Sequence, residues 1–280
     1  MNGTLYLCAT PIGNLEDMTE RVIRTLNEAD MIACEDTRGS IKLLNHFDIH
    51  TPMTSYHEFN RYDKAVTIIG MLKEGKNVAL ITDAGTPVIS DPGEVLVRMC
   101  HEEGICVTSL PGACACITAL SLSGIAGRRF CFEGFLPHDK KERSYVLKEL
   151  KRETRTIILY EAPHHLKATL SVLLDTLGDR EVTICRELTK RFEEIMPTTL
   201  KAACGYYEEN EPRGEYVLVV AGKDPEEVIT EERKKYEDLT IEEHVKKYED
   251  EGLDHKAAMK QAATDRGIPK REVYNALHKT

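Results

Sequence analysis

Short apolar runs alternate with amphipathic helical patterns along the first 122 residues, and this alternation limits the fold more than any other feature. The apolar runs have the length of strands, and the segments between them repeat apolar side chains at helical spacing. The runs expected to form strands are residues 5–9, 30–34, 78–82 and 105–110. Such an order predicts a parallel, doubly wound sheet, in which right-handed crossovers bring the carboxyl ends of the strands to one edge.

A long loop at residues 83–93 follows one of these runs and precedes a helical pattern at 95–100. Its sequence is Asp-Ala-Gly-Thr-Pro-Val-Ile-Ser-Asp-Pro-Gly. The two prolines fix the φ angle where they stand, and the two glycines allow backbone conformations that other residues rarely adopt. Connections of this kind usually have about two to six residues. A ligand loop at the carboxyl edge of the sheet is therefore favoured over an ordinary connection.

Two more strand ends carry unusual loops, at residues 10–17 and 111–115. None of the three loops matches the dinucleotide fingerprint or the P-loop pattern. The loops do offer backbone N–H groups and carboxylates. This combination suits a small zwitterionic or ribose-bearing ligand better than a triphosphate.

The second half of the chain predicts another α/β domain and a helical end. Its strand-like and helical segments are followed by Pro225, which gives predicted domains at 1–112, 113–225 and 226–280. Near the end, a helix at 256–264, a Gly-containing turn and a helix after Pro269 resemble a helix-turn-helix, with a solvated helical hairpin as the alternative. The segments expected to be strands are 130–135, 156–160, 181–186 and 215–221, and those expected to be helices are 141–151 and 165–177.

Charge is unevenly distributed along the chain. The net charge of −10 argues against a general polyanion binder. Residues 128–155 nevertheless hold nine basic and five acidic side chains, and residues 255–280 hold six basic and two acidic ones. These two segments are the candidates for contacts with nucleic-acid phosphates, although a charged run is often only a solvated face.

The nine cysteines lie mostly in apolar runs and include no C-x-x-C pair, which favours buried, reduced thiols in a cytoplasmic protein. No apolar run is long enough to span a membrane, and the first residues lack the features of a secretory signal. No spacing of His, Cys, Asp or Glu favours a metal site. The sequence thus predicts a cytoplasmic protein with neither a membrane segment nor a metal.

Five motifs, taken in order, resemble the bacterial ribosomal RNA small subunit methyltransferase I family of the tetrapyrrole methylase superfamily. The resemblance covers residues 4–222, and the helical end is similar to that family's small C-terminal domain. Two positions depart from the family pattern, since His165 replaces an arginine and Ala113 replaces a proline. The motifs are Thr-Pro-Ile-Gly-Asn-Leu-Glu-Asp (10–17), Glu-Asp-Thr-Arg (35–38), the 83–93 loop, Glu-Gly-Phe-Leu-Pro (133–137) and Arg-Glu-Leu-Thr-Lys (186–190).

The resemblance implies a specific fold and activity. It implies two α/β domains of tetrapyrrole-methylase type with the cofactor cleft between them, plus a small helical C-terminal domain. It implies S-adenosylmethionine as methyl donor, 2′-O-methylation of a cytidine in the decoding region of small-subunit ribosomal RNA, and a homodimer. The partner would be that RNA or the 30S-type subunit. The residues expected to border the cofactor are Ile12, Asp83, Ala84, Gly85, Thr86, Cys114 and Ala115 from the first domain, and Tyr160, Leu188 and Gly214 from the second.

Methyl transfer to a ribose hydroxyl requires alignment of donor and acceptor and a destination for the hydroxyl proton. Glu161, Glu187 and Lys190 are the catalytic candidates, because their motifs are expected near the cleft. Glu187 and Lys190 could instead form an internal ion pair, or Lys190 could contact phosphate. Asp91 is expected to cap the helix that starts near Gly93.

The surroundings of the site leave further choices open. Arg38 could pair with Asp36 or contact RNA. A base could stack on Tyr56, Phe59 or Tyr62.

Two other functions compete with this hypothesis. One is a methylase of the same superfamily that acts on a small tetrapyrrole; the specific motifs and the helical end argue against it. The other is a non-catalytic RNA-binding protein that assists ribosome assembly, which failure to bind S-adenosylmethionine would favour.

Overall fold

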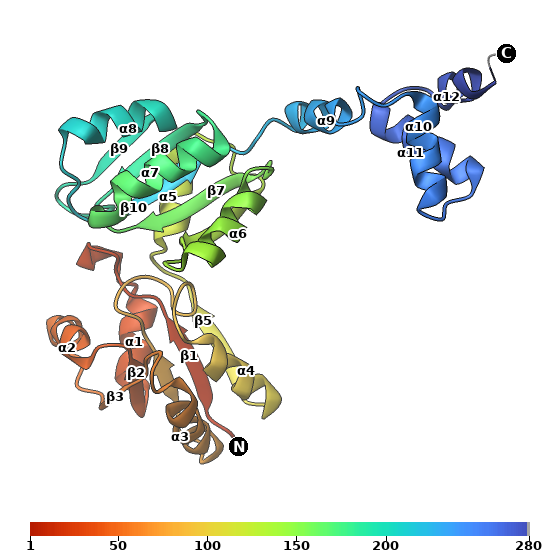
Figure 1. The fold of residues 1–280 in the computed structure, drawn as a ribbon. Helices are drawn as coiled ribbons and strands as arrows, with labels where there is room; N and C mark the ends of the chain where they lie inside the picture. The colour runs from red at the N-terminus through yellow and green to blue at the C-terminus, as the bar shows by residue number, and fades with distance from the viewer. Residues whose placement is uncertain (279–280) are drawn as a thin grey trace. The chain divides into compact units, whose positions relative to one another are not determined.

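The computed structural model describes residues 1–278 (Figure 1). The chain forms two compact units. The larger consists of Met1–Leu147 and Thr156–Ala221; the smaller consists of Lys148–Arg155 and the chain from Gly222 onward. Both sheets belong to the larger unit. The finer division at residues 112 and 225 stays a prediction.

The first sheet is five-stranded and entirely parallel, in the order β3-β2-β4-β1-β5. This confirms the parallel sheet predicted from the sequence. One strand, β3, was not predicted, because its residues Met-Thr-Ser are only half-buried and two of them are polar, so no apolar run marks it. The strands are β1 (Thr4–Cys8), β2 (Met31–Cys34), β3 (Met53–Ser55), β4 (Val78–Leu80) and β5 (Cys106–Leu110).

Helices cover both faces of this sheet, as a doubly wound fold requires. Along β4, Val78 and Leu80 pack into one apolar cluster while Ala79 packs into the other, because successive side chains of a strand point to opposite faces. The first cluster contains residues of α3 (Arg61–Lys73) and α4 (Glu94–Glu102). The second contains residues of α1 (Glu20–Glu28) and α2 (Thr37–His46), with a short 3₁₀ helix, η1 (Leu15–Asp17), just before α1.

The second sheet is five-stranded and mixed, in the order β6-β7-β10-β8-β9. Only β6 and β7 are parallel; the other neighbours are antiparallel. Helix α5 (Ala115–Ser123) packs its Cys116, Ala119 and Leu120 against this sheet. The strands are β6 (Phe130–Phe135), β7 (Thr156–Glu161), β8 (Glu181–Arg186), β9 (Glu194–Thr199) and β10 (Tyr216–Val220), and the other helices are α6 (Lys140–Leu150), α7 (Pro163–Leu177) and α8 (Leu200–Glu209).

The smaller unit is helical toward its C-terminal end, as predicted. The two helices expected near the end are α11 (His255–Arg266) and α12 (Lys270–Leu277), joined through Gly267 at φ +64°. A third helix, α10 (Ile241–Asp250), packs against both, and α9 (Pro225–Lys234) precedes it. The apolar residues that form their shared core are Val245, Ala258, Met259, Ala262, Ala263 and Val273.

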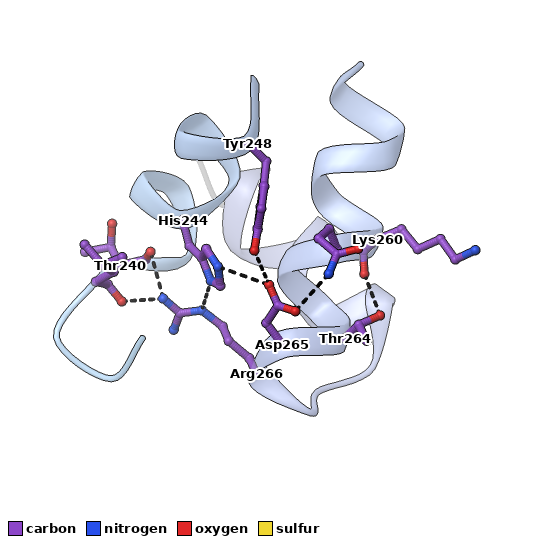
Figure 2. Close-up of polar contacts among 9 residues, drawn as sticks. Thr240, His244, Tyr248, Lys260, Thr264, Asp265 and Arg266 are labelled. Carbon is purple, nitrogen blue, oxygen red and sulfur yellow. Dashed lines mark hydrogen bonds and ion pairs between the residues drawn. The ribbon is translucent and has the colours of Figure 1, made fainter. Parts of the chain in front are cut away.

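A buried polar network links α10 and α11 around His244 (Figure 2). The His244 side chain is fully buried, and its Nδ1 accepts a hydrogen bond of 3.0 Å from Arg266 Nε. Arg266 also donates to the carbonyl oxygen of Thr240 at 3.0 Å, and Asp265 accepts a hydrogen bond from Tyr248. Burial, followed by the charge of Arg266, lowers the pKa of His244. The imidazole is therefore neutral in the folded unit at neutral pH.

Between Met1 and His278, no helix combines the length and the apolar character needed to cross a membrane.

Candidate functional site

A cavity of about 610 Å³ lies in the larger unit, lined by loops from both sheets. From the first sheet it receives the loops that follow β1, β2, β4 and β5; from the second it receives the ends of β6, β7 and β8 and the start of β10. The site thus lies at the carboxyl edge of the parallel sheet, where open α/β sheets bind ligands.

Direct contacts join the three loops that the sequence singled out. Thr10 and Gly85 exchange two backbone hydrogen bonds, of 2.8 and 3.1 Å, between the loops after β1 and β4. Thr86 Oγ1 donates to the carbonyl oxygen of Ala113 at 3.0 Å, which links the loop after β4 to that after β5. The predicted convergence of these loops on one edge is confirmed.

Glycines allow the two sheets to approach each other closely at the cavity. A Cβ added to Gly134 on β6 would lie 2.9 Å from Ser90 Oγ. One added to Gly13 would lie 2.3 Å from Cγ of Lys190. Both gaps are smaller than real Cβ contacts permit, so a side chain at either glycine would force the Ser90 or Lys190 side chain to move.

Nearly all residues expected to border a cofactor line the cavity. Gly214 is the exception: it packs behind Glu187, and its neighbour Glu215 lines the cavity instead. Side chains that the sequence did not indicate also line it, among them Ile89, Phe135 and Val217. The predicted lining residues are Ile12, Asp83, Ala84, Gly85, Thr86, Cys114, Ala115, Tyr160 and Leu188.

The three catalytic candidates are all held by other protein groups. Glu161 is buried and accepts hydrogen bonds from the Ala162 amide at 2.8 Å and from the Thr169 hydroxyl, which fixes the start of α7. Lys190 Nζ lies 2.9 Å from Glu187 Oε1 and 2.8 Å from Glu215 Oε2. The ion-pair alternative for Glu187 and Lys190 is therefore what the structure shows.

The pKa values of this ion pair follow from its contacts. Burial alone would raise the pKa of the Glu187 carboxyl, but hydrogen bonds from Lys190 and the Glu215 amide lower it. Burial opposes the charge of Lys190 as well, and its two carboxylate partners raise its pKa. Both groups stay charged near neutral pH, which makes neither suited to exchange a proton there.

Glu35 belongs to the 35–38 motif but was not among the predicted site residues, and it lines the cavity directly after β2. Among the residues that the structure describes, its half-buried carboxylate has no hydrogen-bond or ion-pair partner. Burial, followed by the nearby charges of Asp83 and Asp91, raises its pKa. A strand-end argument applied to β2 would have found it, because β2 pairs with β4 and the loops after both strands share one edge.

Two expectations about single residues are wrong. Asp91 does not cap α4; it accepts a 2.8 Å hydrogen bond from Thr82 Oγ1, and Gly93 begins the helix without a side-chain cap. Tyr56 cannot stack on a base, because it is buried and donates its hydroxyl hydrogen bond to the Pro92 carbonyl at 3.2 Å. Of the other aromatic candidates, Phe59 is 97% exposed and Tyr62 is also exposed.

Arg38 is paired with Asp36, with 3.2 Å between Nη2 and Oδ2. Its guanidinium is nevertheless almost fully exposed, and the hydrogen bonds from Arg38 lower the pKa of the Asp36 carboxyl.

Backbone strain concentrates in the loops at the cavity. Val88 and Ser90, in the loop after β4, have φ of 77° and 61°. Glu187 and Thr189, after β8, have φ of 50° and 65°. Non-glycine residues in this region cost about 1–3 kcal/mol each, and such strain persists where the surrounding structure holds a functional geometry.

Residues 4–204 match the model of the tetrapyrrole (corrin/porphyrin) methylases. The chain belongs to the tetrapyrrole methylase family. The fold expected from the sequence motifs, with two sheets of this type and a helical C-terminal region, is therefore confirmed.

Curated relatives match this methylase over almost its whole length. It is 51% identical over 276 residues to the ribosomal RNA small subunit methyltransferase I of Bacillus subtilis, a match that covers 99% of this chain and 94% of the relative. It is 47% identical to the protein of the same name from Synechocystis, with 97% and 96% covered. The resemblance inferred from the sequence motifs is confirmed, and the chain is a methyltransferase.

Solved structures share the fold of this methylase at low identity. A diphthine synthase has a TM-score of 0.62 and 13% identity, with 78% of this chain and 90% of that chain covered. The uroporphyrin-III C-methyltransferase of Thermus thermophilus, in complex with S-adenosyl homocysteine, has a TM-score of 0.56 and 17% identity, with 81% and 99% covered.

Proposed function

We propose that this methylase transfers the methyl group of S-adenosylmethionine to the 2′-hydroxyl of a cytidine in the decoding region of small-subunit ribosomal RNA. The observation that carries the proposal is the match to ribosomal RNA methyltransferases over almost the whole chain, the C-terminal helices included. The family model ends at residue 204, before those helices begin. This favours an RNA substrate over a small tetrapyrrole.

The cavity has the size and the charge that suit the donor. About 610 Å³ lies within the range of pockets that hold cofactors. Asp83, Asp91 and Glu35 line its first-sheet side, while Lys190, on the other side, is neutralised by two carboxylates. An excess of negative charge favours the sulfonium and ammonium groups of S-adenosylmethionine and disfavours a polyphosphate.

Glu35 is proposed as the acceptor of the hydroxyl proton. It lines the cavity, and no protein group among the described residues competes for its carboxylate. Its raised pKa brings it closer to the operating pH, where general bases are most effective. Glu161 and Glu187 are less suited, because hydrogen bonds already hold their oxygen atoms.

The RNA would be held by basic side chains outside the cavity. Lys256, Lys260, Lys270 and Arg271 are exposed on α11 and α12, and phosphate contacts of this kind supply most of the sequence-independent affinity for nucleic acid. A homodimer and the 30S-type subunit as substrate belong to the same proposal. Light scattering at several protein concentrations tests the dimer.

Isothermal titration calorimetry with the Asp83→Ala variant tests the cofactor site. Asp83 lines the cavity and accepts a 3.3 Å hydrogen bond from the Asp36 amide, so its loss removes a charged ligand contact without opening the core. Affinity for S-adenosylmethionine should fall about 10- to 100-fold, the usual value of a hydrogen bond to a charged group. Asp63→Ala, at an exposed position on α3 outside the cavity, should bind like the wild type. Equal affinities of all three proteins would remove Asp83 from the site.

A further inference from the structure

Two thiols lie in contact in the wall of the cavity, at the start of α5. The Sγ atoms of Cys114 and Cys116 are 3.4 Å apart. Cys114 is half-buried and lines both the main cavity and a second hollow of about 360 Å³. Cys116 is buried against the second sheet. The Cys114 sulfur is thus accessible to a small solute, and the Cys116 sulfur is buried in contact with it.

We propose that Cys114 and Cys116 form a peroxide-sensitive dithiol that closes to a disulfide and reshapes the cofactor cavity. The Cys114 thiolate attacks one oxygen of a hydroperoxide, whose O–O bond breaks to give the sulfenic acid and hydroxide (or alkoxide). The Cys116 sulfur then displaces hydroxide from the sulfenic acid and loses its proton. In sum, two thiols are oxidised to one disulfide, and hydrogen peroxide is reduced to two waters.

The proximity of the Cys116 thiol contributes more to disulfide formation than the acidity of the Cys114 thiol does. Contacts with Cys116 and with backbone N–H groups at the start of α5 lower the pKa of Cys114 to about 6. The lower pKa raises the thiolate fraction at neutral pH, but an acidic thiolate is also a weaker nucleophile, so the two effects partly cancel. A neighbouring thiol at van der Waals distance, by contrast, captures the sulfenic acid before a second oxidation.

Closing the bond must change the cavity wall. A disulfide has an S–S distance near 2.05 Å, so the sulfur atoms must approach by about 1.3 Å. Cys116 is the less mobile partner, because it is packed in the core and its amide donates a 3.1 Å hydrogen bond to Tyr160 Oη. Cys114 must therefore move, and with it the contact that its sulfur makes with the Thr86 side chain on the opposite loop. On the proposed function, this lowers affinity for the cofactor and its product.

The chemistry is tested on the full chain with hydrogen peroxide, dimedone as sulfenic-acid probe, and peptide mass spectrometry. The wild type should form a Cys114–Cys116 disulfide with little dimedone label. Cys116→Ala should accumulate dimedone on Cys114, and Cys114→Ala should show neither product. Cys204→Ala is the matched control, since Cys204 lies outside both hollows and should not alter the result. If the wild type shows no disulfide, or Cys116→Ala shows no label on Cys114, the proposal is wrong. Cys114→Ser serves as the second variant if Cys114→Ala fails to fold.

Titration with S-adenosyl homocysteine tests the consequence for the cavity. The reduced wild type should bind it, the oxidised wild type should bind at least tenfold more weakly, and dithiothreitol should restore binding. Oxidation should leave the affinity of Cys114→Ser within about threefold of that of its own reduced form, because neither the sulfenic acid nor the disulfide can form there. A disulfide that leaves the wild-type affinity unchanged would contradict the effect on the cavity. If the reduced protein does not bind while the disulfide still forms, the proposed function fails and the dithiol stands.

Discussion

At the scale of single residues, the carboxylates around the cavity differ in their hydrogen-bond and ion-pair partners. Glu161 is fixed by the Ala162 amide and Thr169, and Glu187 is fixed by Lys190. These groups maintain the shape of the site. Glu35 faces the same cavity without a protein partner among the described residues, so its carboxylate is available to a substrate.

Replacing Glu35 by glutamine should therefore lower the rate of methyl transfer far more than the affinity for S-adenosylmethionine, because Asp83 and Asp91 still supply negative charge to the cavity. Loss of a general base lowers a rate about 10²- to 10⁴-fold, and the isosteric amide preserves the packing. Single-turnover methyl transfer measures the rate, and calorimetry measures affinity for S-adenosylmethionine. Glu94→Gln, at an exposed position in the first turn of α4, is the control. A wild-type rate in Glu35→Gln would exclude Glu35 as the base.

The Glu35→Gln substitution should also change how the rate of methyl transfer depends on pH. A base acts in its deprotonated form, and burial together with Asp83 and Asp91 raises the pKa of Glu35. The wild-type rate should therefore rise with pH through a pKa above the ordinary range for glutamate. This rising limb should be absent in Glu35→Gln. A limb that persists unchanged would assign the titration to another group.

At the scale of elements, the sequence predicted the regular parts well and the irregular ones less well. On α3, the apolar residues that recur at helical spacing (Ala65, Ile68, Ile69 and Leu72) are the buried ones, so the 13-residue helix shows its period clearly. The edge strand β9 was missed: it contains Pro197, none of its residues is buried, and polar and apolar residues do not alternate along it. Short or edge strands depend on pairing partners, which local periodicity does not reveal.

The candidate site shows the same limit. Loops with unusual composition could be placed at the carboxyl edge of the first sheet, because the carboxyl ends of parallel strands lie at the same edge. The ion pair of Lys190 with Glu187 was foreseen as an alternative, but that with Glu215 was not. Glu215 is 25 residues away in sequence and reaches Lys190 only through the antiparallel pairing of β8 and β10. Asp91 was misassigned for a related reason, since its partner Thr82 lies at the opposite end of the same loop.

Replacement by alanine should have opposite effects on stability at two glycines, Gly214 in the turn before β10 and Gly205 within α8. Gly214 has φ +81°, and an added Cβ would lie 2.5 Å from Cγ of Glu187. Gly214→Ala should therefore lower stability by about 1–3 kcal/mol. Gly205 lies exposed within α8 with open space around it, so Gly205→Ala should raise stability by about 0.5–1 kcal/mol. Thermal unfolding followed by circular dichroism compares the two, and a stabilised Gly214→Ala variant would contradict the packing described.

At the scale of the whole molecule, the two units differ in the interactions that stabilise each of them internally. The larger unit has extensive cores around two sheets, whereas the C-terminal helices combine a small core with the polar network of His244. A buried group that carries no charge when folded makes that unit sensitive to acid.

The C-terminal helices should lose stability as pH falls. The folded pKa of His244 lies below its unfolded value of about 6.5, so the unfolded state binds the proton more tightly and gains as pH drops below that value. Hydrogen exchange on the full chain, corrected for the intrinsic effect of pH, should show protection in α10 and α11 falling from pH 7 to about pH 5.5. His244→Asn retains an acceptor for Arg266 without titrating, and its protection should depend less on pH. Constant protection in the wild type would contradict this role.

The most direct test of the central claim is methyl transfer from labelled S-adenosylmethionine to small ribosomal subunits that lack modifications. Mapping of alkali-resistant linkages then separates ribose from base methylation, because a 2′-O-methyl group blocks cleavage at its own linkage. One labelled, resistant linkage at a cytidine of the decoding region is the predicted result. Label on a base, or no transfer by a protein that still binds the cofactor, would contradict the proposed acceptor.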